Sequence, residues 1–557
     1  MKTLTIVFLS ALFIFFSYSQ DKKENPFKYP LERELDSKAP TYPGPVNTNP
    51  APPVFFNINI SQNSAPQNEP SVCISRKNPN RVVAAWRDFR YGIDPNANRR
   101  VGYSYSTNAG LTWSGSLILD SLLLPGLTRN SDPVVTVDTA GNFYIAVIAI
   151  SPTGSNLTLA VYKSVNGGMT FPFAYISSQT GTEDKEWIAS DLSPISPFVN
   201  NLYISWTSFS LGGIRLTKST NGGANWLTPV AVSATTGDVQ GSHLCVSRNG
   251  QINVVWLQFS TNGVVRFDRS TDGGTTFGTD VSVASGTFPS GLPNDVNTFP
   301  NIAVDNSSGP RSGWLYIAFA DNRNGDCDVF LCKSTDNGST WSPPFRVNND
   351  PINNGKIQYW PAIEVSTNGN LAIIYMDTRN TANNTIIEAY IARSYDGGSS
   401  FTNELISTEP SPTGIPGSNV RFGDYIDIDY VGTNVVPVWT DERNGGFNMD
   451  IFTAEISEFI AVGTEHNTIP KNYTLLQNYP NPFNPSTFIS FGLPTNSYIT
   501  LKVYDIMGRE VKEIVKGNLT LGYHTYSFNA SGLTSGIYFY TLTAGDYKDT
   551  RKMVLIK

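Results

Sequence analysis

The stretch that decides the fold is Ser106-Thr-Asn-Ala-Gly-Leu-Thr-Trp113, because it is the first of six copies of one pattern, Ser-x-Asp/Asn-x-Gly-x-x-Trp/Phe. The later copies begin at intervals of 51 to 64 residues. The fixed positions of the six copies are Ser106, Asn108, Gly110 and Trp113; Ser164, Asn166, Gly168 and Phe171; Ser219, Asn221, Gly223 and Trp226; Ser270, Asp272, Gly274 and Phe277; Ser334, Asp336, Gly338 and Trp341; and Ser394, Asp396, Gly398 and Phe401. Six copies at such even spacing indicate a chain built from repeated units.

Each fixed position of this pattern suits a tight turn between strands. The Asn or Asp side chain can accept backbone N–H groups across the turn, Gly tolerates a positive φ, and the final aromatic can pack between sheets. The first three copies carry Asn and the last three carry Asp, so the position does not need a charge. The pattern therefore predicts a structural turn rather than a catalytic group.

The sequence around each copy also repeats, with two alternating strands and a third strand that runs into the pattern, as at residues 82–86 and 202–206. Four short strands per repeat of this length are typical of a β-propeller blade. A seventh unit, near residues 425–456, lacks the pattern and a fourth strand. Residues 54–61 (VFFNINIS) alternate like the missing strand. We therefore predict an all-β, seven-bladed propeller over residues 53–459, closed by this N-terminal strand in the last blade.

Composition excludes several classes of protein. The 557 residues carry a net charge of −7, and only 15% of them are charged, so a basic nucleic-acid-binding protein is excluded. Residues 1–19 have the basic start, apolar stretch and small-x-small end of a secretory signal peptide. We find no later apolar run of membrane-spanning length, so we expect an exported protein that is not integral to a membrane.

The remaining segments flank the predicted propeller. Residues 20–52 form a Pro-rich linker, and residues 460–471 form a second linker. Residues 472–557 contain β runs without the repeated pattern, which fits a small Ig-like β-sandwich.

Both main parts of the chain resemble known families. The six copies quoted above resemble the Asp-box (BNR) repeats of sialidase-like β-propellers. The tail, with Tyr479-Pro-Asn-Pro-Phe-Asn-Pro-Ser-Thr487 and Lys552-Met-Val-Leu-Ile-Lys557, resembles the type A C-terminal sorting domain of the bacterial type IX secretion system. The second resemblance implies a Bacteroidetes-like bacterium, export through the periplasm, handling by that machinery, and release or attachment at the cell surface.

Loops after the second strands repeat an Asp-x-Arg motif. The four copies are Asp88 and Arg90, Asp321 and Arg323, Asp377 and Arg379, and Asp441 and Arg443. Residues two apart on an extended chain face the same way, so each Arg can pair with its own Asp. The alternative is a ring of free guanidinium groups that binds carboxylates or sulfates.

Loops that lead into the first strands bring together a different set of residues. They contain Asp132, Asp184 to Trp187, Asp238, His243, Tyr359, Trp360, and Arg421 to Tyr425. Aromatic faces stack on sugar rings and carboxylates accept from hydroxyls, so this face is a candidate glycan-binding site. The alternative is that Trp187 and Trp360 pack between blades.

The sialidase resemblance implies a Tyr nucleophile with a nearby Glu, an acid/base Asp and several Arg residues. Tyr425, or Tyr359 in its place, supplies the first type, Glu388 or Glu186 the second, and Asp88 the third. The ligand-binding candidates are Arg90, Arg323, Arg379, Arg443, Arg421, Trp360 and Tyr359. An Arg-Ile-Pro motif typical of sialidases is absent.

Two hypotheses for function remain open at this point. The protein is either a sialidase-like glycoside hydrolase or a non-catalytic surface module that binds glycan or protein. Neither hypothesis requires a cofactor, and no metal site is assigned. Asn324-Gly-Asp-Cys-Asp328 resembles part of a calcium loop and could hold a structural Ca²⁺. The glycan or partner, the stereochemistry of any hydrolysis, release or anchoring, and the oligomeric state do not follow from the sequence.

Overall fold

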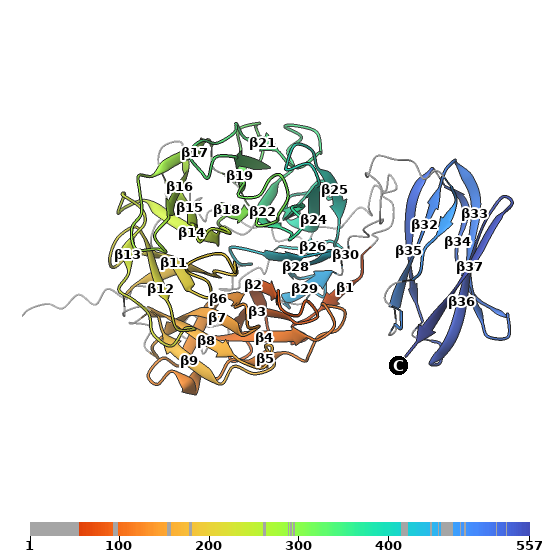
Figure 1. The fold of residues 1–557 in the computed structure, drawn as a ribbon, viewed down its shortest axis with the longest axis horizontal. Helices are drawn as coiled ribbons and strands as arrows, with labels where there is room; N and C mark the ends of the chain where they lie inside the picture. Colours follow the sequence, from red (N-terminus) through yellow and green to blue (C-terminus); the bar gives the residue numbers. More distant parts are fainter. Residues whose placement is uncertain are drawn as a thin grey trace, which may run out of the picture. The chain divides into compact units, whose positions relative to one another are not determined.

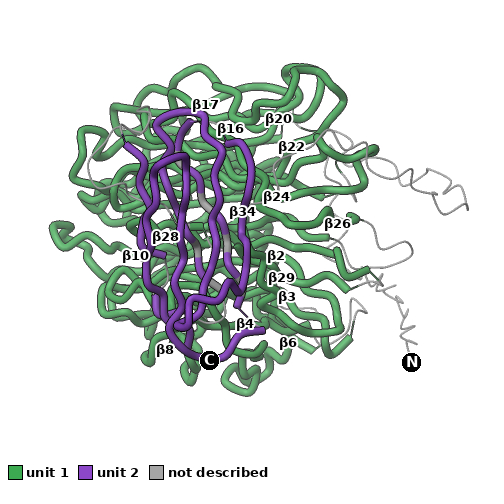
Figure 2. Tube along the Cα trace, turned by 90° about the vertical axis from the view of Figure 1, so that its right-hand side faces the viewer, with its two compact units in different colours: residues 1–49, 55–458 green, residues 50–54, 459–557 purple. Residues whose placement is uncertain are grey.

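The computed structural model describes residues 55–92, 99–152, 157–177, 181–259, 263–287, 289, 292, 296–413, 422–445, 448–454, 456–457, 472–478, 481–483, 486–519, 521–530 and 532–556. The predicted signal peptide and both predicted linkers lie outside the described residues. The described part divides into two compact units, one from residue 55 to 457 and one from residue 472 to 556 (Figures 1 and 2).

The first unit consists of seven antiparallel sheets of four strands, numbered here in chain order. Sheet 1 contains β2 (Gln67–Ile74), β3 (Val82–Asp88), β4 (Arg100–Ser106) and β5 (Leu117–Ile118). Sheet 2 contains β6 (Arg129–Val137), β7 (Phe143–Ile150), β8 (Leu157–Ser164) and β9 (Phe173–Ile176). Sheet 3 contains β10 (Glu183–Ser190), β11 (Leu202–Ser208), β12 (Ile214–Ser219) and β13 (Val230–Ala231). Sheet 4 contains β14 (Val239–Val246), β15 (Ile252–Gln258), β16 (Val264–Ser270) and β17 (Val281–Ser285).

The remaining sheets follow the same plan. Sheet 5 contains β18 (Asn301–Val304), β19 (Leu315–Asp321), β20 (Asp328–Ser334) and β21 (Phe345–Arg346). Sheet 6 contains β22 (Gln358–Val365), β23 (Leu371–Asp377), β24 (Ile386–Ser394) and β25 (Thr402–Leu405), with β26 (Ser411–Pro412) as an extra partner of β24. Sheet 7 contains β27 (Asp427–Val431), β28 (Asn434–Asp441), β29 (Asp450–Ala454) and β1 (Asn57–Asn59), with β30 (Ile456–Ser457) beside β28. A 3-10 turn, η2 (Ser121–Leu123), follows sheet 1.

The sheets form a closed, propeller-like ring. The first strands β2, β6, β10, β14, β18, β22 and β27 contact each other in order, and β27 contacts β2. Short outer strands such as β5, β9 and β13 lie at the rim (Figure 1). The first strands of all seven sheets line a central cavity of about 460 Å³.

The N-terminal strand closes the ring as the sequence predicts. β1 pairs antiparallel with β29, with Asn57 opposite Ala454 and Asn59 opposite Phe452. The Ile60 N–H then donates to the Ile451 carbonyl at 2.9 Å. The last sheet therefore takes its fourth strand from the start of the described chain, which covers an edge that would otherwise be open.

The core lies between neighbouring sheets. In β7, the run FYIAVIAI is buried at every position, because its alternating side chains face two different sheets. Tyr144, Ala146 and Ile148 pack toward sheet 3, whereas Phe143 and Ile145 pack toward sheet 1. A continuous apolar strand is the expected sequence for a sheet covered on both faces.

The repeated pattern forms the turn between the third and fourth strands. In its first copy, Ser106 Oγ donates to Asn108 Oδ1 at 2.9 Å and accepts from the Gly110 N–H at 2.9 Å. Asn108 Oδ1 also accepts from the Thr112 N–H at 2.9 Å. In the second copy, Gly168 has φ 85°, and a Cβ there would lie 2.0 Å from Val83 Cγ2 in sheet 1. Only glycine fits this close approach between sheets.

Lysine side chains form hydrogen bonds between a repeated turn and the sheet that precedes it. Lys163 Nζ in β8 donates to the Gly222 carbonyl of the next turn at 3.0 Å. Lys333 Nζ in β20 makes the same contact with the Gly397 carbonyl at 3.1 Å. The repeated turns thus join the sheets, in addition to connecting strands within each sheet.

The second unit is a β-sandwich. One sheet contains β31 (Thr474–Leu475), β32 (Ser486–Leu493) and β35 (Gly522–Asn529), and the other contains β34 (Glu510–Leu519), β33 (Ser497–Asp505), β36 (Gly536–Ala544) and β37 (Tyr547–Leu555). Their inner faces bury Ile489, Phe491, Leu501, Tyr540 and Met553. Among the described residues, no helix has the length and apolar character needed to cross a membrane.

Candidate functional site

The first strands of five sheets share a β-bulge at the same place, close to the candidate site. In sheets 1, 2, 3, 4 and 6, the pairing between the first and second strands shifts at a β-bulge. The first residue within each bulge has a positive φ of 53° to 71°, and these residues are Glu69, Asp132, Lys185, Gly241 and Trp360. Positive φ is uncommon for residues other than glycine, and bulges often re-aim side chains beside functional sites.

The bulges of sheets 2, 3, 4 and 6 contribute residues to one pocket of about 40 Å³. Its lining comes from first strands or the residues just before them, and consists of Asp132, Lys185, Glu186, Trp187, Gly241, Ser242, His243, Phe299, Pro300, Asn301, Trp360, Pro361, Asp424, Tyr425 and Ile426. The loops that the sequence singled out as a candidate glycan site therefore do converge. Asp238, by contrast, does not line the pocket, and Arg421 lies outside the described residues.

A buried arginine joins two carboxyl groups at the edge of this pocket. Arg87 Nη1 lies 3.3 Å from Glu69 Oε2, within ion-pair range although not in hydrogen-bond geometry, and 3.7 Å from Asp132 Oδ1. The two carboxyl oxygens are therefore separated by no more than the sum of these distances, 7.0 Å. Arg87 Nε also donates to Asn68 Oδ1 at 2.7 Å, which fixes the guanidinium in place.

A second ion pair involves the pocket lysine. Lys185 Nζ lies 3.9 Å from Asp424 Oδ2 and 4.2 Å from the centre of the Tyr425 ring. It is also 5.1 Å from the centre of the Phe299 ring. The Tyr425 hydroxyl donates to the Pro133 carbonyl at 3.2 Å. The lysine ammonium thus occupies a cage of two aromatic rings and one carboxylate.

Burial sets the protonation of the acids around the pocket. Desolvation raises the pKa of Glu69 to about 8, despite the opposing charge of Arg87. Desolvation and the charge of Asp132 raise the pKa of Asp184 to about 7. Desolvation also raises the pKa of Glu186 well above its ordinary value. For Asp132, burial acts in the same direction, but Arg87 and the Ser131 hydroxyl outweigh it and lower the pKa. The site therefore combines carboxyl groups whose pKa values are raised by burial with one, Asp132, whose pKa is lowered.

The Asp-x-Arg motifs do not lie in this pocket. Every Arg makes side-chain hydrogen bonds to its own Asp at 2.6 to 3.1 Å, as for Arg90 on Asp88 and Arg443 on Asp441. The four Asp side chains are essentially inaccessible, and each also accepts the backbone N–H of its Arg. This geometry corresponds to the structural-pairing alternative.

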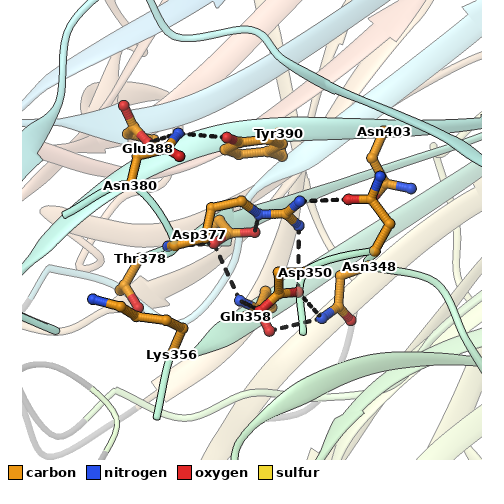
Figure 3. A network of polar contacts seen from close by, with 12 residues as sticks. Asn348, Asp350, Lys356, Gln358, Asp377, Thr378, Asn380, Glu388, Tyr390 and Asn403 are labelled. Carbon is orange, nitrogen blue, oxygen red and sulfur yellow. Dashed lines mark hydrogen bonds and ion pairs between the residues drawn. The ribbon is translucent and has the colours of Figure 1, made fainter. Parts of the chain in front are cut away.

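The Asp-x-Arg motif of Asp377 and Arg379 belongs to a wider network of side-chain hydrogen bonds. Asp377, the partner of Arg379, accepts from Gln358 Nε2 at 3.1 Å (Figure 3). Asn348 Nδ2 donates to Asp350 at 2.7 Å and to Gln358 Oε1 at 2.8 Å (Figure 3). These contacts connect neighbouring loops and hold the polar groups in fixed positions.

Of the catalytic candidates Tyr425, Asp88 and Glu388, only Tyr425 lines the pocket. Glu388, in β24, accepts from Asn380 Nδ2 at 2.8 Å, and Asn380 also donates to Tyr390 (Figure 3). Asp88 accepts from the Trp86 indole at 3.1 Å as well as from Arg90. Desolvation raises the pKa of the Tyr425 hydroxyl, and the charges of Glu69, Asp132 and Glu186 raise it further. The Glu186 alternative thus shares the pocket with Tyr425.

Tyr359 and Trp360 differ in position although they are adjacent. Tyr359 is completely buried, and desolvation raises the pKa of its hydroxyl above the usual range. Trp360 lines the pocket, stacks on Phe422 with ring centres 6.0 Å apart, and donates from its indole to the Asn297 carbonyl at 2.6 Å. Trp187 lies 4.0 Å from the His243 ring. Both tryptophans therefore pack against other rings and line the pocket, Trp360 as a buried side chain and Trp187 as a partly buried one.

The carboxylates of the predicted calcium loop accept hydrogen bonds from N–H groups of the protein. Asp328 accepts from Asn324 at 2.8 Å, from Arg346 at 2.6 Å and from Asn348 at 2.7 Å. Asp326 accepts backbone N–H groups from residues 353 and 355. Among the described residues, no group of three or more His, Cys, Asp or Glu side chains is arranged to hold a metal ion. The structural Ca²⁺ stays a prediction.

The sequence did not predict two residues at the edge of the pocket, Glu69 and Arg87. Glu69 precedes Pro70 at the same place in its unit as Asp132 before Pro133 and Trp360 before Pro361. This repeated residue-Pro pair could have identified Glu69. Arg87 directly precedes Asp88 of the first Asp-x-Arg motif, and neighbouring residues of a strand face opposite ways.

Comparison with known proteins identifies the tail. Residues 477–557 match the family described as the secretion system C-terminal sorting domain. The protein is therefore handled by the type IX secretion system and sorted to the cell surface or the extracellular space. No curated protein matches the sequence of this chain.

Solved structures show distant similarity to the chain. A protein of unknown function from Dyadobacter fermentans is 14% identical, with a TM-score of 0.40, covering 73% of this chain and 98% of the other. The leech intramolecular trans-sialidase is 13% identical, with a TM-score of 0.41, covering 57% of this chain and 67% of the other. The phage phi92 endosialidase is 11% identical, with a TM-score of 0.43, covering 90% and 87%. The function proposed for this chain rests on the residues of its own pocket.

Proposed function

We propose that the first unit is a seven-bladed, sialidase-like β-propeller that binds an extracellular glycan at the pocket of about 40 Å³ described above. The observation that carries this proposal is the convergence of Trp187, Trp360 and Tyr425 with buried carboxyl groups. Aromatic faces cover the apolar faces of sugar rings, and fixed polar groups give orientation, as in most small-molecule sites. Sorting to the cell exterior would bring the pocket into contact with such ligands.

The charges favour a neutral sugar over a sialic acid. Among the described lining residues there is no arginine. Arg87, at the edge, is shared by Glu69 and Asp132, and Lys185 faces Asp424. The anionic ligand expected from the sialidase resemblance would lack free guanidinium groups and would meet several carboxyl groups.

Glycan-array binding of the purified full chain tests this function. We expect binding to a defined subset of neutral glycans, and loss of that binding in Trp187→Ala. Phe173→Ala is the matched control, because Phe173 is an exposed aromatic on the outer strand β9. Circular dichroism checks that both variants keep the fold. Binding to no glycan, or equal binding by Trp187→Ala, would overturn the proposal.

Glycoside hydrolysis is the second candidate, favoured by the pair Glu69 and Asp132. Their carboxyl oxygens lie within 7.0 Å of each other, and their pKa values are shifted in opposite directions. A protonated acid beside an ionised carboxylate is the arrangement that glycosidases use. Glu69 would donate the proton to the leaving oxygen, and Asp132 would act as nucleophile or base.

A panel of fluorogenic aryl glycosides, including a sialoside, separates the two candidates. Hydrolysis predicts turnover that falls at least about a hundredfold in Glu69→Gln, in line with loss of a general acid. Turnover of the sialoside that is lost in Tyr425→Phe would instead favour the sialidase-like chemistry. No turnover of any glycoside, with glycan binding retained, would leave the non-catalytic binding function.

A further inference from the structure

Two adjacent pocket residues have polar atoms without partners. Lys185 is 8% exposed and Glu186 is 2% exposed, and both line the pocket. Among the described residues, Lys185 Nζ has no hydrogen-bond acceptor. The two Glu186 carboxyl oxygens likewise lack a described hydrogen-bond partner, apart from that residue's own backbone N–H. Buried polar groups normally make hydrogen bonds. The Lys185 ammonium is 3.9 Å from its ion-pair partner Asp424 and has no hydrogen-bond acceptor, so together with the Glu186 carboxyl group it points to a ligand that supplies both an acceptor and a donor.

The charges around this pair balance. Arg87 and Lys185 are the two cations, and Asp132 and Asp424 lie against them at 3.7 and 3.9 Å. The remaining acids are Glu69, Asp184 and Glu186, whose pKa values are raised by burial. A ligand group with a full charge would upset this balance in a desolvated place, whereas a neutral dipolar group would not.

The pocket is small. A single water requires about 10–15 Å³ on the same scale, so a volume of about 40 Å³ admits a group of a few heavy atoms. A whole sugar ring does not fit, so the ring must stay at the mouth while one substituent enters. Phe299, Trp360 and Pro361 supply an apolar wall beside the polar pair.

We propose that the pocket recognises the acetamido group of an N-acetylhexosamine unit. The Lys185 ammonium donates to the amide carbonyl, the Glu186 carboxyl group accepts from the amide N–H, and the methyl group packs on the apolar wall. This inference rests on the proposed glycan binding and names the sugar class that the pocket selects.

The geometry argues against an ammonium group as the ligand. The aromatic cage of Tyr425 and Phe299 already holds the Lys185 ammonium at 4.2 and 5.1 Å from the ring centres. A ligand ammonium would have to displace it or lie beside it. A ligand carboxylate would meet Glu186 and Asp424 on the pocket wall.

The test compares matched oligosaccharides that differ only at carbon 2. Titration calorimetry of the full chain measures binding of 2-acetamido, 2-hydroxy and 2-amino members, in gluco and galacto series. We expect the acetamido member to bind at least about tenfold more tightly than the other two, which corresponds to the loss of one or two hydrogen bonds. Equal or tighter binding of a hydroxy or amino member would overturn the inference.

Variants assign the selectivity to the polar pair. Lys185→Met keeps the apolar stem and Glu186→Leu keeps the bulk, and each is expected to reduce the acetamido preference to within about threefold. The matched control Lys163→Met removes an ammonium that contacts Gly222 outside the pocket, and it should keep the full preference. If a variant does not fold, the wild-type comparison alone decides the inference. Failure of every glycan to bind would overturn the proposed function itself, whereas binding without an acetamido preference would overturn only this inference.

Discussion

The hydroxyl group of Ser61 donates to Asp450 Oδ1 at 3.1 Å, across 389 residues of sequence. Ser61 Oγ also accepts the backbone N–H of Ile451 at 2.9 Å, and Ser61 is fully buried. This contact follows directly after β1 and fixes it to the last sheet. Ring closure therefore depends on a buried side-chain hydrogen bond as well as on the three residue pairs between β1 and β29.

The Ser61 contact yields the first prediction. Ser61→Ala leaves a buried carboxyl group and a buried N–H each with one partner fewer, so we expect destabilisation by about 1–3 kcal/mol. Chemical denaturation followed by tryptophan fluorescence measures it. The exposed Ser210→Ala change is not a suitable control, because Ser210 contacts Glu183. Thr408→Ser, which keeps the hydroxyl at an exposed position, should change stability by less than about 0.5 kcal/mol. A Ser61→Ala effect as small as that of the control would contradict the role of this contact.

Removal of Arg87 should destabilise the protein in a pH-dependent way. Arg87→Gln leaves Glu69 and Asp132 buried without their shared cation, and breaking such a buried pair costs about 3–5 kcal/mol. The loss should be largest near pH 8 and smaller near pH 5, where the carboxyl groups can take up protons instead. Melting temperatures of wild type and variant at the two pH values check this. The control is Arg509→Gln, in the second unit, whose exposed ion pair with Asp505 should matter little at either pH. An equal loss at pH 5 and pH 8 would argue against the shared-cation role.

Glu364 lines the central cavity, and its burial should make the free energy of unfolding decline as the pH rises. Desolvation and the charge of Asp429 raise the pKa of Glu364 to about 8, against an ordinary value of 4.5. The folded protein therefore binds this proton more tightly than the unfolded chain. The resulting stabilisation is complete below about pH 4.5 and is lost as the pH rises through 8. Glu364→Gln should flatten this decline and stabilise the protein at pH 8.5 by more than about 1 kcal/mol. Denaturation midpoints measured from pH 5 to 8.5 provide the test, and parallel curves for the two proteins would refute it.

The Asp-x-Arg motifs offer a direct test of their two interpretations. Arg323→Gln removes the partner of the buried Asp321, so we expect destabilisation by about 2–4 kcal/mol and unchanged glycan affinity. Denaturation and glycan titration on the same preparation measure both quantities. Retained stability with lost binding would instead favour the ring of guanidinium groups.

Much of the fold follows from the sequence because its determinants are local. The Ser-x-Asp/Asn-x-Gly pattern places its turn through hydrogen bonds within eight residues, as between Ser106 and Gly110. Its repetition gives the number of units, and the alternation in residues 54–61 identifies the strand that closes the last sheet. The sorting domain is likewise recognisable from its residues alone.

The sequence predicted part of the candidate site. It identified the loops that hold Asp132, Glu186, Trp187 and Tyr425, because side chains that precede equivalent strands lie on the same end of a repeated structure. It left two interpretations of Arg90 and its counterparts open, because the spacing of two residues permits both pairing and free display. It missed Glu69 and Arg87, since their proximity to Asp132 joins two different sheets.

The sequence by itself determined the repeat, the turn chemistry and the tail, all of which depend on neighbouring residues. Only the tertiary structure decided which polar side chains meet. The bulges give Glu69, Asp132 and Lys185 a positive φ. Closure of the ring then brings Asp132 and Lys185 into one pocket with Asp424 and Tyr425, and Arg87 joins Glu69 to Asp132 at its edge. Burial in that place sets the protonation of the acids, because desolvation depends on everything packed around a group rather than on its neighbours in sequence.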